Sequence, residues 1–268
     1  MFKNGGRFYI SVDLEGLACV IGEYGKGLGF DTPGYAYARG EATEEVNAAV
    51  KALYDRGASE VWVWDSHGKG YNLLYDKLDP RTRIVMGAGS KKRFPLIETG
   101  FDGVLFIGYH GYDVPNAVLA HVYSSLTYQY MRVNGKDVGE AQIDGAIAGK
   151  YGVPVIFLSS DDICVSQAKE SFPGAKTVVT KRSLAWNSCV SEHPETVKKA
   201  IYAAVCDAAD AIAPEPFVFG SPFEYEIRYK RIEYAESCAL RSFDNKPFER
   251  VDAYTVKGTL ADPEDILR

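Results

Sequence analysis

The stretch Phe8-Tyr9-Ile10-Ser11-Val12-Asp13-Leu14-Glu15-Gly16 places two acids directly after a run of aromatic and β-branched residues. Such a run predicts a β-strand over residues 8–13. Three later apolar runs also end in ionisable residues, at Asp65-Ser66-His67, Gly108-Tyr109-His110 and Ser159-Ser160-Asp161-Asp162. Because ligands of open α/β sheets bind beyond the carboxyl ends of the strands, these four ends predict a functional site.

Helical patterns separate the predicted strands. Apolar residues recur at helical spacing over 42–53 and 197–212, and a further helix is expected over 140–150. Strands that alternate with helices predict an α/β fold of three layers, α/β/α, around a mixed, mainly parallel sheet. The Asn134-Gly135 pair predicts a hairpin over 128–138, which we expect to make that sheet mixed.

The prolines at 214 and 216 mark a change of character along the chain. Residues 1–214 are expected to form the α/β core that carries the site. Residues 215–268 are expected to form a smaller C-terminal α+β extension that packs on the core or at an oligomer interface. Alternating polarity predicts a half-exposed strand over 223–229. A short helix over 232–240 and a strand over 251–256 are expected to follow it.

Composition excludes two kinds of partner. The chain has 268 residues, a net charge of −6 and no basic run, so nucleic acid is not expected to bind. No stretch reaches the roughly 20 apolar residues that cross a bilayer, and the N-terminus lacks the apolar core of a signal peptide. Neither a membrane partner nor export is therefore expected.

Scattered cysteines without a C-x-x-C pair indicate thiols in a reducing compartment, so we expect a cytoplasmic protein.

Five residues near the strand ends have the side chains of a metal site: Asp13, Glu15, His67, His110 and Glu140. The first two lie two positions apart, so an extended chain points them to the same face, where the carboxylates repel unless a cation or proton intervenes. Each residue also has a simpler interpretation. The acids could form a solvated strand end, the histidines could be structural, and Glu140 could be an acid favoured by a helix dipole.

Taken together, the five residues offer three carboxylates and two imidazoles, more than one metal ion with an open position needs. Two divalent ions fit better, with one carboxylate and a hydroxide between them. Imidazole and carboxylate ligands without a thiolate favour Zn²⁺, with Mn²⁺ or Co²⁺ as alternatives. The sequence therefore predicts a di-metal hydrolytic site.

Five motifs in order link the chain to a known family: Ser11-Val12-Asp13-Leu14-Glu15-Gly16, Asp65-Ser66-His67, Gly108-Tyr109-His110, the lone His121, and Val138-Gly139-Glu140. With this order and spacing, the chain resembles the dipeptide-transport-type D-aminopeptidases over nearly its whole length. The resemblance implies a di-zinc aminopeptidase that assembles as a decamer of two stacked pentameric rings.

The resemblance also implies roles for single residues. Asp13 matches the bridging ligand, and the remaining ligands match Glu15, His67, His110 and Glu140. His121 matches the residue assigned as catalytic nucleophile, although a histidine beside a metal-activated hydroxide can instead accept a proton or steady the oxyanion. A half-buried structural histidine is the alternative for this position.

The predicted function is release of N-terminal residues, D-amino acids by the resemblance, from short peptides by a metal-activated hydroxide. Four further acids are candidates for orienting ligand histidines or binding the substrate amine, with capping or solvation as the alternative: Asp65, Asp144, Asp161 and Asp162. Two other functions stay open. One is a di-metal amidase acting on a non-peptide substrate. The other is a non-catalytic peptide-binding protein, which would be expected to lack a ligand or His121.

Overall fold

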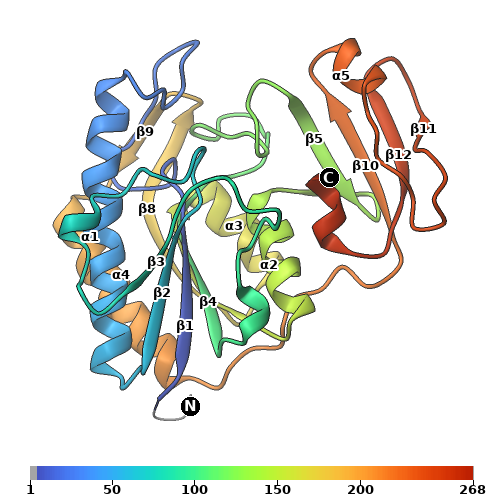
Figure 1. Ribbon diagram of the computed structural model, residues 1–268. Coiled ribbons are helices and arrows are strands. Elements are labelled where there is room, and N and C mark those ends of the chain that lie inside the picture. The colour runs from blue at the N-terminus through green and yellow to red at the C-terminus, as the bar shows by residue number, and fades with distance from the viewer. Residues whose placement is uncertain (1–4, 268) are drawn as a thin grey trace.

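A computed structural model describes residues 5–267, and two sheets organise it (Figure 1). The main sheet has seven strands in the order β3-β2-β1-β4-β7-β8-β9. Their bounds are Arg7–Val12 for β1, Glu60–Asp65 for β2, Arg83–Val85 for β3, Gly103–Tyr109 for β4, Val155–Asp161 for β7, Lys176–Ala185 for β8 and Ser188–Ser191 for β9. All neighbours pair in parallel except β8 and β9, so the predicted mixed, mainly parallel sheet is confirmed.

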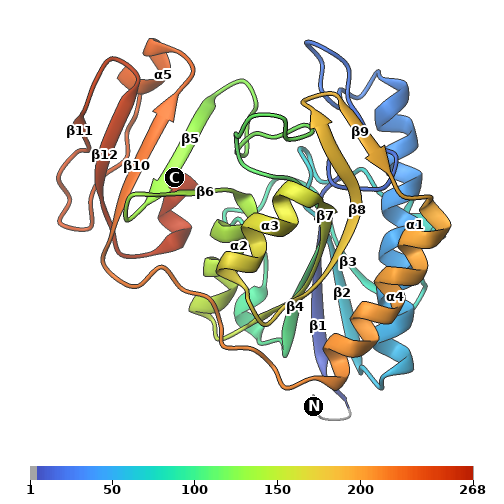
Figure 2. The same ribbon diagram turned by 180° about the vertical axis from the view of Figure 1, so that it is seen from behind.

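Helices cover both faces of this sheet, which confirms the three-layer α/β/α arrangement (Figures 1 and 2). On one face lie α1 (Pro33–Asp55) and α4 (Pro194–Asp210), and on the other α2 (Glu140–Lys150) and α3 (Asp162–Ser171). The core divides in the same way. Along β1, Phe8 and Ile10 pack with α1 and α4, whereas Tyr9 packs with α2 and α3, because successive strand side chains point to opposite faces.

The second sheet has five strands in the order β11-β12-β10-β5-β6, all antiparallel (Figure 1). Their bounds are Tyr128–Val133 for β5, Lys136–Val138 for β6, Phe223–Tyr229 for β10, Glu249–Arg250 for β11 and Thr255–Leu260 for β12. This C-terminal region also contains α5 (Ile232–Glu236) and a short 3-10 helix, η3 (Pro263–Leu267). Along the chain, two other 3-10 helices separate strands of the main sheet: η1 (Tyr75–Lys77) between β2 and β3, and η2 (Ile97–Thr99) between β3 and β4.

The predicted hairpin forms, but its effect on the main sheet was predicted wrongly. Asn134 and Gly135 both have positive φ, 51° and 76°, as a tight hairpin turn requires. However, β5 pairs with β10 of the C-terminal segment, not with a strand of the main sheet. The antiparallel β8–β9 pair makes the main sheet mixed instead. The hairpin therefore belongs to the five-stranded sheet, together with the strands of residues 215–268. The division of the chain between residues 214 and 215 stays a prediction.

The types of the C-terminal elements were predicted correctly, but two of their boundaries were predicted wrongly. The strand expected over 251–256 lies at Thr255–Leu260. The carboxylate of Asp252 accepts hydrogen bonds from the backbone N–H groups of Tyr254 and Thr255, at 2.7 and 2.9 Å, and so turns the chain before the strand begins. The helix expected over 232–240 ends at Glu236. The segments that form α3, β8 and β9 were not predicted.

The strand order locates the functional region. Strand β1 lies between β2 and β4; α1 connects β1 to β2 on one face, and α2 precedes β7 on the other. This reversal of direction is the topological switch point, and in open α/β sheets ligands bind there, beyond the carboxyl ends of the strands. Asp13 directly follows β1 and His110 directly follows β4. Within residues 5–267, no helix has the length and apolar content needed to cross a bilayer.

Candidate metal centre

The segment after β1 is pressed against the end of β4. The backbone N–H of Asp13 donates to the carbonyl of Ile107, and that of Gly16 donates to the carbonyl of Gly108, both at 2.8 Å. A Cβ atom on Gly16 would lie 1.9 Å from the carbonyl oxygen of Tyr109, so only glycine fits there. The glycine of the Asp-Leu-Glu-Gly motif therefore allows the approach that brings its two acids close to the end of β4.

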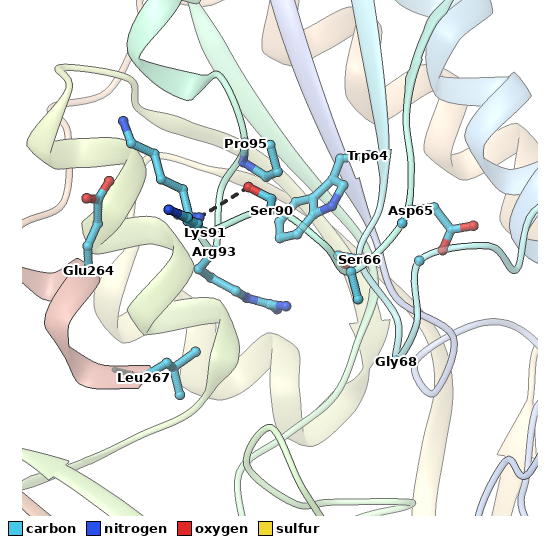
Figure 3. A pocket seen from close by; sticks show the side chains of 14 residues that line it. Trp64, Asp65, Ser66, Gly68, Ser90, Lys91, Arg93, Pro95, Glu264 and Leu267 are labelled. Atoms are coloured by element: carbon cyan, nitrogen blue, oxygen red, sulfur yellow. Dashed lines mark hydrogen bonds between the residues drawn. The ribbon is translucent and has the colours of Figure 1, made fainter. Parts of the chain in front are cut away.

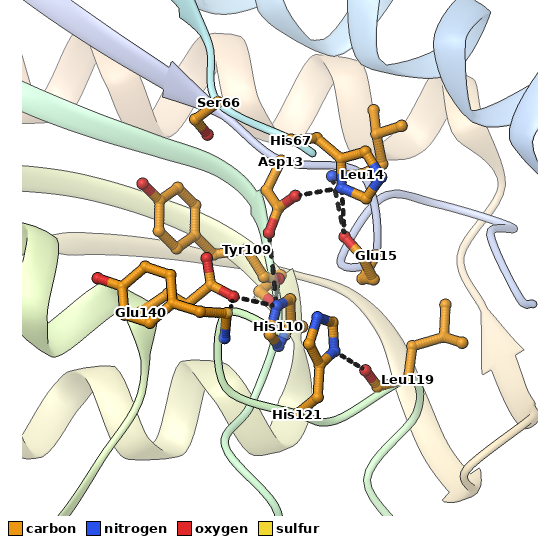
Figure 4. A network of polar contacts seen from close by, with 12 residues as sticks. Asp13, Leu14, Glu15, Ser66, His67, Tyr109, His110, Leu119, His121 and Glu140 are labelled. Carbon is orange, nitrogen blue, oxygen red and sulfur yellow. Dashed lines mark hydrogen bonds and ion pairs between the residues drawn. The ribbon is translucent and has the colours of Figure 1, made fainter. Parts of the chain in front are cut away.

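The five predicted ligands meet beyond the carboxyl ends of β1 and β4 (Figure 4). Nδ1 of His67 lies 2.8 Å from Oδ1 of Asp13 and 3.2 Å from Oε2 of Glu15. Nε2 of His110 lies 3.5 Å from Oδ2 of Asp13 and 3.1 Å from Oε1 of Glu140. Asp13 thus contacts both histidines, one with each carboxylate oxygen, which is the position that a bridging group would take.

Burial and the neighbouring charges shift the pKa values of the acids and histidines in this cluster. Burial, together with the charge of Glu15, raises the pKa of Asp13 to about 7. Burial would also raise the pKa of Glu15 and Glu140, but His67 holds the first well below its usual range and His110 lowers the second to about 2. Burial would lower the pKa of His110, yet its hydrogen bond to Glu140 and the nearby carboxylates raise it to about 10. The acids therefore need compensating positive charge.

A metal ion could supply that charge. In the described part of the chain, two groups of side chains each bring their ligand atoms within 4.8 Å of one another. One contains Asp13, Glu15 and His110, and the other contains His110, His121 and Glu140. Carboxylate oxygen and imidazole nitrogen are the ligands that zinc accepts in open hydrolytic sites. The residues therefore fit one or more zinc ions, with His110 common to both groups.

His121 lies against the cluster on an irregular loop. Its ring stacks on that of His110, with centroids 3.9 Å apart (Figure 4). Nδ1 of His121 lies 2.8 Å from the carbonyl oxygen of Leu119, so this nitrogen carries the proton and donates. Burial and the charge of His110 lower the pKa of His121 to about 4. The ring is therefore neutral at physiological pH, and Nε2 keeps its lone pair.

Among the four further acids, Asp65 and Asp144 lie beside the ligands. Asp65 accepts hydrogen bonds from the backbone N–H groups of Asn72 and Leu73, at 2.5 and 2.9 Å, and so closes the loop that carries His67. Asp144 is fully buried and takes two 3.0 Å hydrogen bonds from Arg93. Neither carboxylate contacts a ligand histidine, and their roles at the site stay predictions.

Asp161 and Asp162 lie at the start of α3. The carboxylate of Asp161 accepts from the backbone N–H groups of Ile163 and Cys164, which caps the helix. The carboxylate of Asp162 accepts from the backbone N–H of Ser183 at 2.8 Å, which ties α3 to β8. The contacts of Asp161 are those of the capping alternative, whereas Asp162 links two elements, and the roles of both acids at the site stay predictions.

Sequence reasoning missed Arg93. Its guanidinium donates to both oxygens of Asp144 and lies 3.2 Å from Oε2 of Glu140, between the rings of Trp64 and Tyr123. This contact fixes the oxygen of Glu140 that does not face His110. In the sequence, Arg93 follows two lysines after a glycine-rich segment and gives no signal of burial.

Arg93 also forms one wall of a cavity of about 240 Å³ beside the metal centre (Figure 3). The loop that carries His67 supplies another wall through Ser66 and Gly68. The loop that carries His67 therefore contributes to both the cavity and the candidate metal centre, although with different residues.

An α/β sandwich with buried carboxylates and imidazoles converging at the reversal of strand order has the architecture of a metallohydrolase. The chain belongs to the peptidase M55 family of D-aminopeptidases, whose family model matches residues 7–268.

A relative and a solved structure illustrate the relationship. A D-aminopeptidase from Bacillus subtilis (strain 168) is 32% identical over 185 residues, which is 66% of this chain and 64% of that protein. The match thus spans just under two-thirds of the relative's length. The solved structure of a zinc-dependent D-aminopeptidase from Bacillus subtilis, DppA, described as a self-compartmentalizing protease, has the same fold. Its TM-score is 0.86 at 24% identity, covering 97% of this chain and 94% of that one.

Proposed function

We propose that this protein is a zinc-dependent aminopeptidase that releases N-terminal D-amino acids from short peptides. The observation that carries the proposal is the buried cluster in which Asp13 contacts His67 and His110 with separate oxygens. Membership of the D-aminopeptidase family supports the reaction. The descriptions of the two relatives from Bacillus subtilis support the metal and the D-residue preference.

The residues that would hold zinc are Asp13, Glu15, His67, His110 and Glu140. We propose two ions per subunit, because the charge of two divalent ions exceeds that of three carboxylates by one, which a hydroxide offsets; Mn²⁺ or Co²⁺ could replace them. Zinc bound there would polarise the peptide carbonyl and lower the pKa of water at the site.

His121 is proposed to move the proton. Its Nδ1–H is engaged by the carbonyl of Leu119, so Nε2 is the atom available to accept a proton from attacking water and to return it to the leaving amine. Burial keeps the imidazole neutral and therefore able to accept. His121 also belongs to one of the potential ligand groups, and its role as ligand or proton carrier is open to direct measurement.

The geometry of Glu140 is proposed to depend on two donors that remain when His110 binds a metal, the backbone N–H of Tyr123 and the guanidinium of Arg93. One oxygen faces Nε2 of His110 and the backbone N–H of Tyr123, at 3.1 and 2.8 Å, and the other faces Arg93 at 3.2 Å. With both oxygens engaged, the carboxylate cannot rotate freely. Such fixed ligand orientation is what a metal site needs to keep an open coordination position.

Metal removal and restoration test the function. The purified protein would be stripped with a chelator, assayed for zinc by mass spectrometry, and reloaded with Zn²⁺, Mn²⁺ or Co²⁺. The substrates would be D-Ala and L-Ala p-nitroanilides and the corresponding dipeptides. We expect turnover of D-Ala substrates that chelation abolishes and zinc restores. Absence of turnover on every one of these substrates would refute the aminopeptidase assignment. Turnover confined to non-peptide amides would indicate the amidase.

Assembly and location complete the proposal. We propose a homo-oligomer, a decamer of two pentameric rings, consistent with the description of DppA as self-compartmentalizing. Sedimentation with mass photometry would check it, and a stable monomer would argue against it. The cytoplasmic location stays a prediction that cell fractionation can test.

A further inference from the structure

Lys181 of β8 is completely buried, and its ammonium group has a shell of carbonyl oxygens. Nζ donates to the carbonyl oxygens of Glu15 at 2.5 Å, Leu17 at 3.0 Å and Val20 at 2.6 Å. An ammonium has three N–H donors, so every donor has one partner. All three partners come from the segment that follows β1 and contains the proposed ligand Glu15.

An irregularity in β8 allows this contact. The register between β7 and β8 shifts between Ser160 and Asp161, so that Ser160 pairs with Val179 but Asp161 pairs with Lys181. Consecutive strand residues normally point to opposite faces, and a bulge removes that constraint. Thr180 and Lys181 are both buried, and both contact the segment that follows β1. The hydroxyl of Thr180 donates to the carbonyl of Gly16 at 2.5 Å, next to the carbonyl that Lys181 binds.

Side chains of α1 and β9 accept hydrogen bonds from backbone N–H groups of the same segment. The carboxylate of Glu45, on α1, accepts from the backbone N–H of Ala18 at 2.9 Å. The hydroxyl of Ser191, on β9, accepts from the backbone N–H of Cys19 at 2.7 Å. Residues 13–20 form no helix or strand, so these side chains take the place of regular backbone pairing.

We propose that Lys181 is a positioning residue for the metal centre: its ammonium holds residues 15–20 in one conformation and thereby sets the place of the Glu15 carboxylate. That carboxylate lies 3.2 Å from Nδ1 of His67. Three carbonyl oxygens converging on one point repel one another unless a cation lies between them. Lys181 thus acts as a built-in monovalent cation. The inference rests on the zinc site of the proposed function.

The charge, not only the volume, of Lys181 is required. Lys181→Met keeps an apolar chain of similar length without any donor. Lys181→Ala leaves a space that n-propylammonium can enter. The matched control is Lys198→Met, which removes a lysine of α4 that pairs with Glu195 at 2.6 Å and does not contact residues 15–20.

The readouts are the zinc dissociation constant, measured by competition with a chromophoric chelator, and the visible absorption spectrum of the Co²⁺-loaded protein. We expect Lys181→Met to weaken zinc binding at least tenfold and to shift the cobalt bands. Propylammonium should restore both in Lys181→Ala but not in Lys181→Met, and the losses in Lys181→Met, which keeps the volume, are what a space-filling role would not give. Lys198→Met should match the parent in both measurements.

A folded Lys181→Met protein with the parent's zinc affinity and cobalt spectrum would overturn the inference. If that variant does not fold, Lys181→Ala folded in the presence of propylammonium decides. Weaker zinc binding when the amine is removed supports the inference, and unchanged binding overturns it. A parent protein that binds neither zinc nor cobalt would instead remove the proposed metal site, and this inference with it.

Discussion

The imidazole rings of His110 and His121 lie nearly parallel, with planes 14° apart and centroids 3.9 Å apart. His110 contacts the carboxylates of Asp13 and Glu140, whereas His121 is anchored to the carbonyl of Leu119. A proposed metal ligand and a proposed proton carrier are therefore in direct contact while held by separate segments. Replacing His121 should consequently alter proton transfer more than ligand geometry.

The first prediction concerns His121→Ala. If His121 carries a proton, kcat should fall by about 10²–10⁴-fold, while the zinc content per subunit stays that of the parent. The measurement pairs steady-state kinetics on a D-Ala p-nitroanilide with zinc analysis on the same sample. Loss of a zinc ion would make His121 a ligand, and full activity would remove it from the reaction. His193→Ala is the control, because His193 caps α4 outside the metal cluster.

The second prediction concerns the glycine of the Asp-Leu-Glu-Gly motif. Gly16→Ala would bring a Cβ atom to 1.9 Å from the carbonyl oxygen of Tyr109, so the segment must move away from β4. We expect lower thermal stability and weaker zinc binding. Gly40→Ala is the matched control: within α1 its Cβ would meet nothing within 4 Å, and alanine favours a helix by roughly 0.5–1 kcal/mol over glycine. Equal melting temperatures and zinc affinities for the two variants would contradict the prediction.

The third prediction concerns the ion pair between the partly buried Arg93 and the buried Asp144. Arg93→Met leaves Asp144, which is 0% exposed, without its two 3.0 Å charge-assisted bonds. Removing one partner of a buried pair costs about 3–5 kcal/mol. Urea denaturation of the metal-free protein should show a loss of this size.

The control for the pair is Lys51→Met, which breaks an exposed pair with Asp55 on α1. Exposed pairs contribute about 0–1 kcal/mol. A loss for Arg93→Met no larger than that for Lys51→Met would show that the pair of Arg93 and Asp144 does not stabilise the fold.

The fourth prediction concerns pH and Glu45. Burial raises the pKa of this carboxyl from 4.5 to about 8, so the folded protein binds its proton more tightly than the unfolded chain does. Between these two values the folded state carries the extra proton, and the free energy of unfolding must fall as pH rises. This contribution is fully present below pH 4.5 and is lost as pH rises through about 8.

Glu45→Gln should remove that dependence because an amide does not titrate. Urea denaturation of the metal-free protein from pH 5 to pH 9 should therefore show a smaller decrease in stability for the variant than for the parent. Glu44→Gln, whose side chain is 53% exposed on the same helix, is the control and should follow the parent. Parallel pH profiles for Glu45→Gln and the parent would refute the assignment.

Local sequence patterns predicted much of the fold. The helix expected over 140–150 is α2, Glu140–Lys150, and the alternating run over 223–229 is β10. In both, the signal lies within the element: a helix start after Gly139, and polarity that alternates with exposure along the strand. The strand ends predicted the positions of Asp13, His67 and His110 because parallel strands bring their carboxyl ends to one edge.

Long-range packing decided what local patterns could not. The Asn134-Gly135 turn specified a hairpin, but pairing with β10, some 90 residues further along the chain, decided which sheet it joined. Arg93 and Lys181 are charged residues that local patterns place on the surface. Lys181 is buried because three backbone carbonyls compensate its charge, and Arg93 lies partly buried against Asp144.

The sequence by itself thus determined the α/β class, the edge of the sheet that carries the candidate site and the residues proposed to bind a metal. Each follows from periodicity and side-chain chemistry, which are local properties. The tertiary structure alone decided how those residues are held, through the close approach at Gly16, the Arg93 contact to Glu140 and the Lys181 contact to Glu15. These contacts join segments distant in sequence, and their energies depend on burial and charge compensation that exist only once the chain has folded.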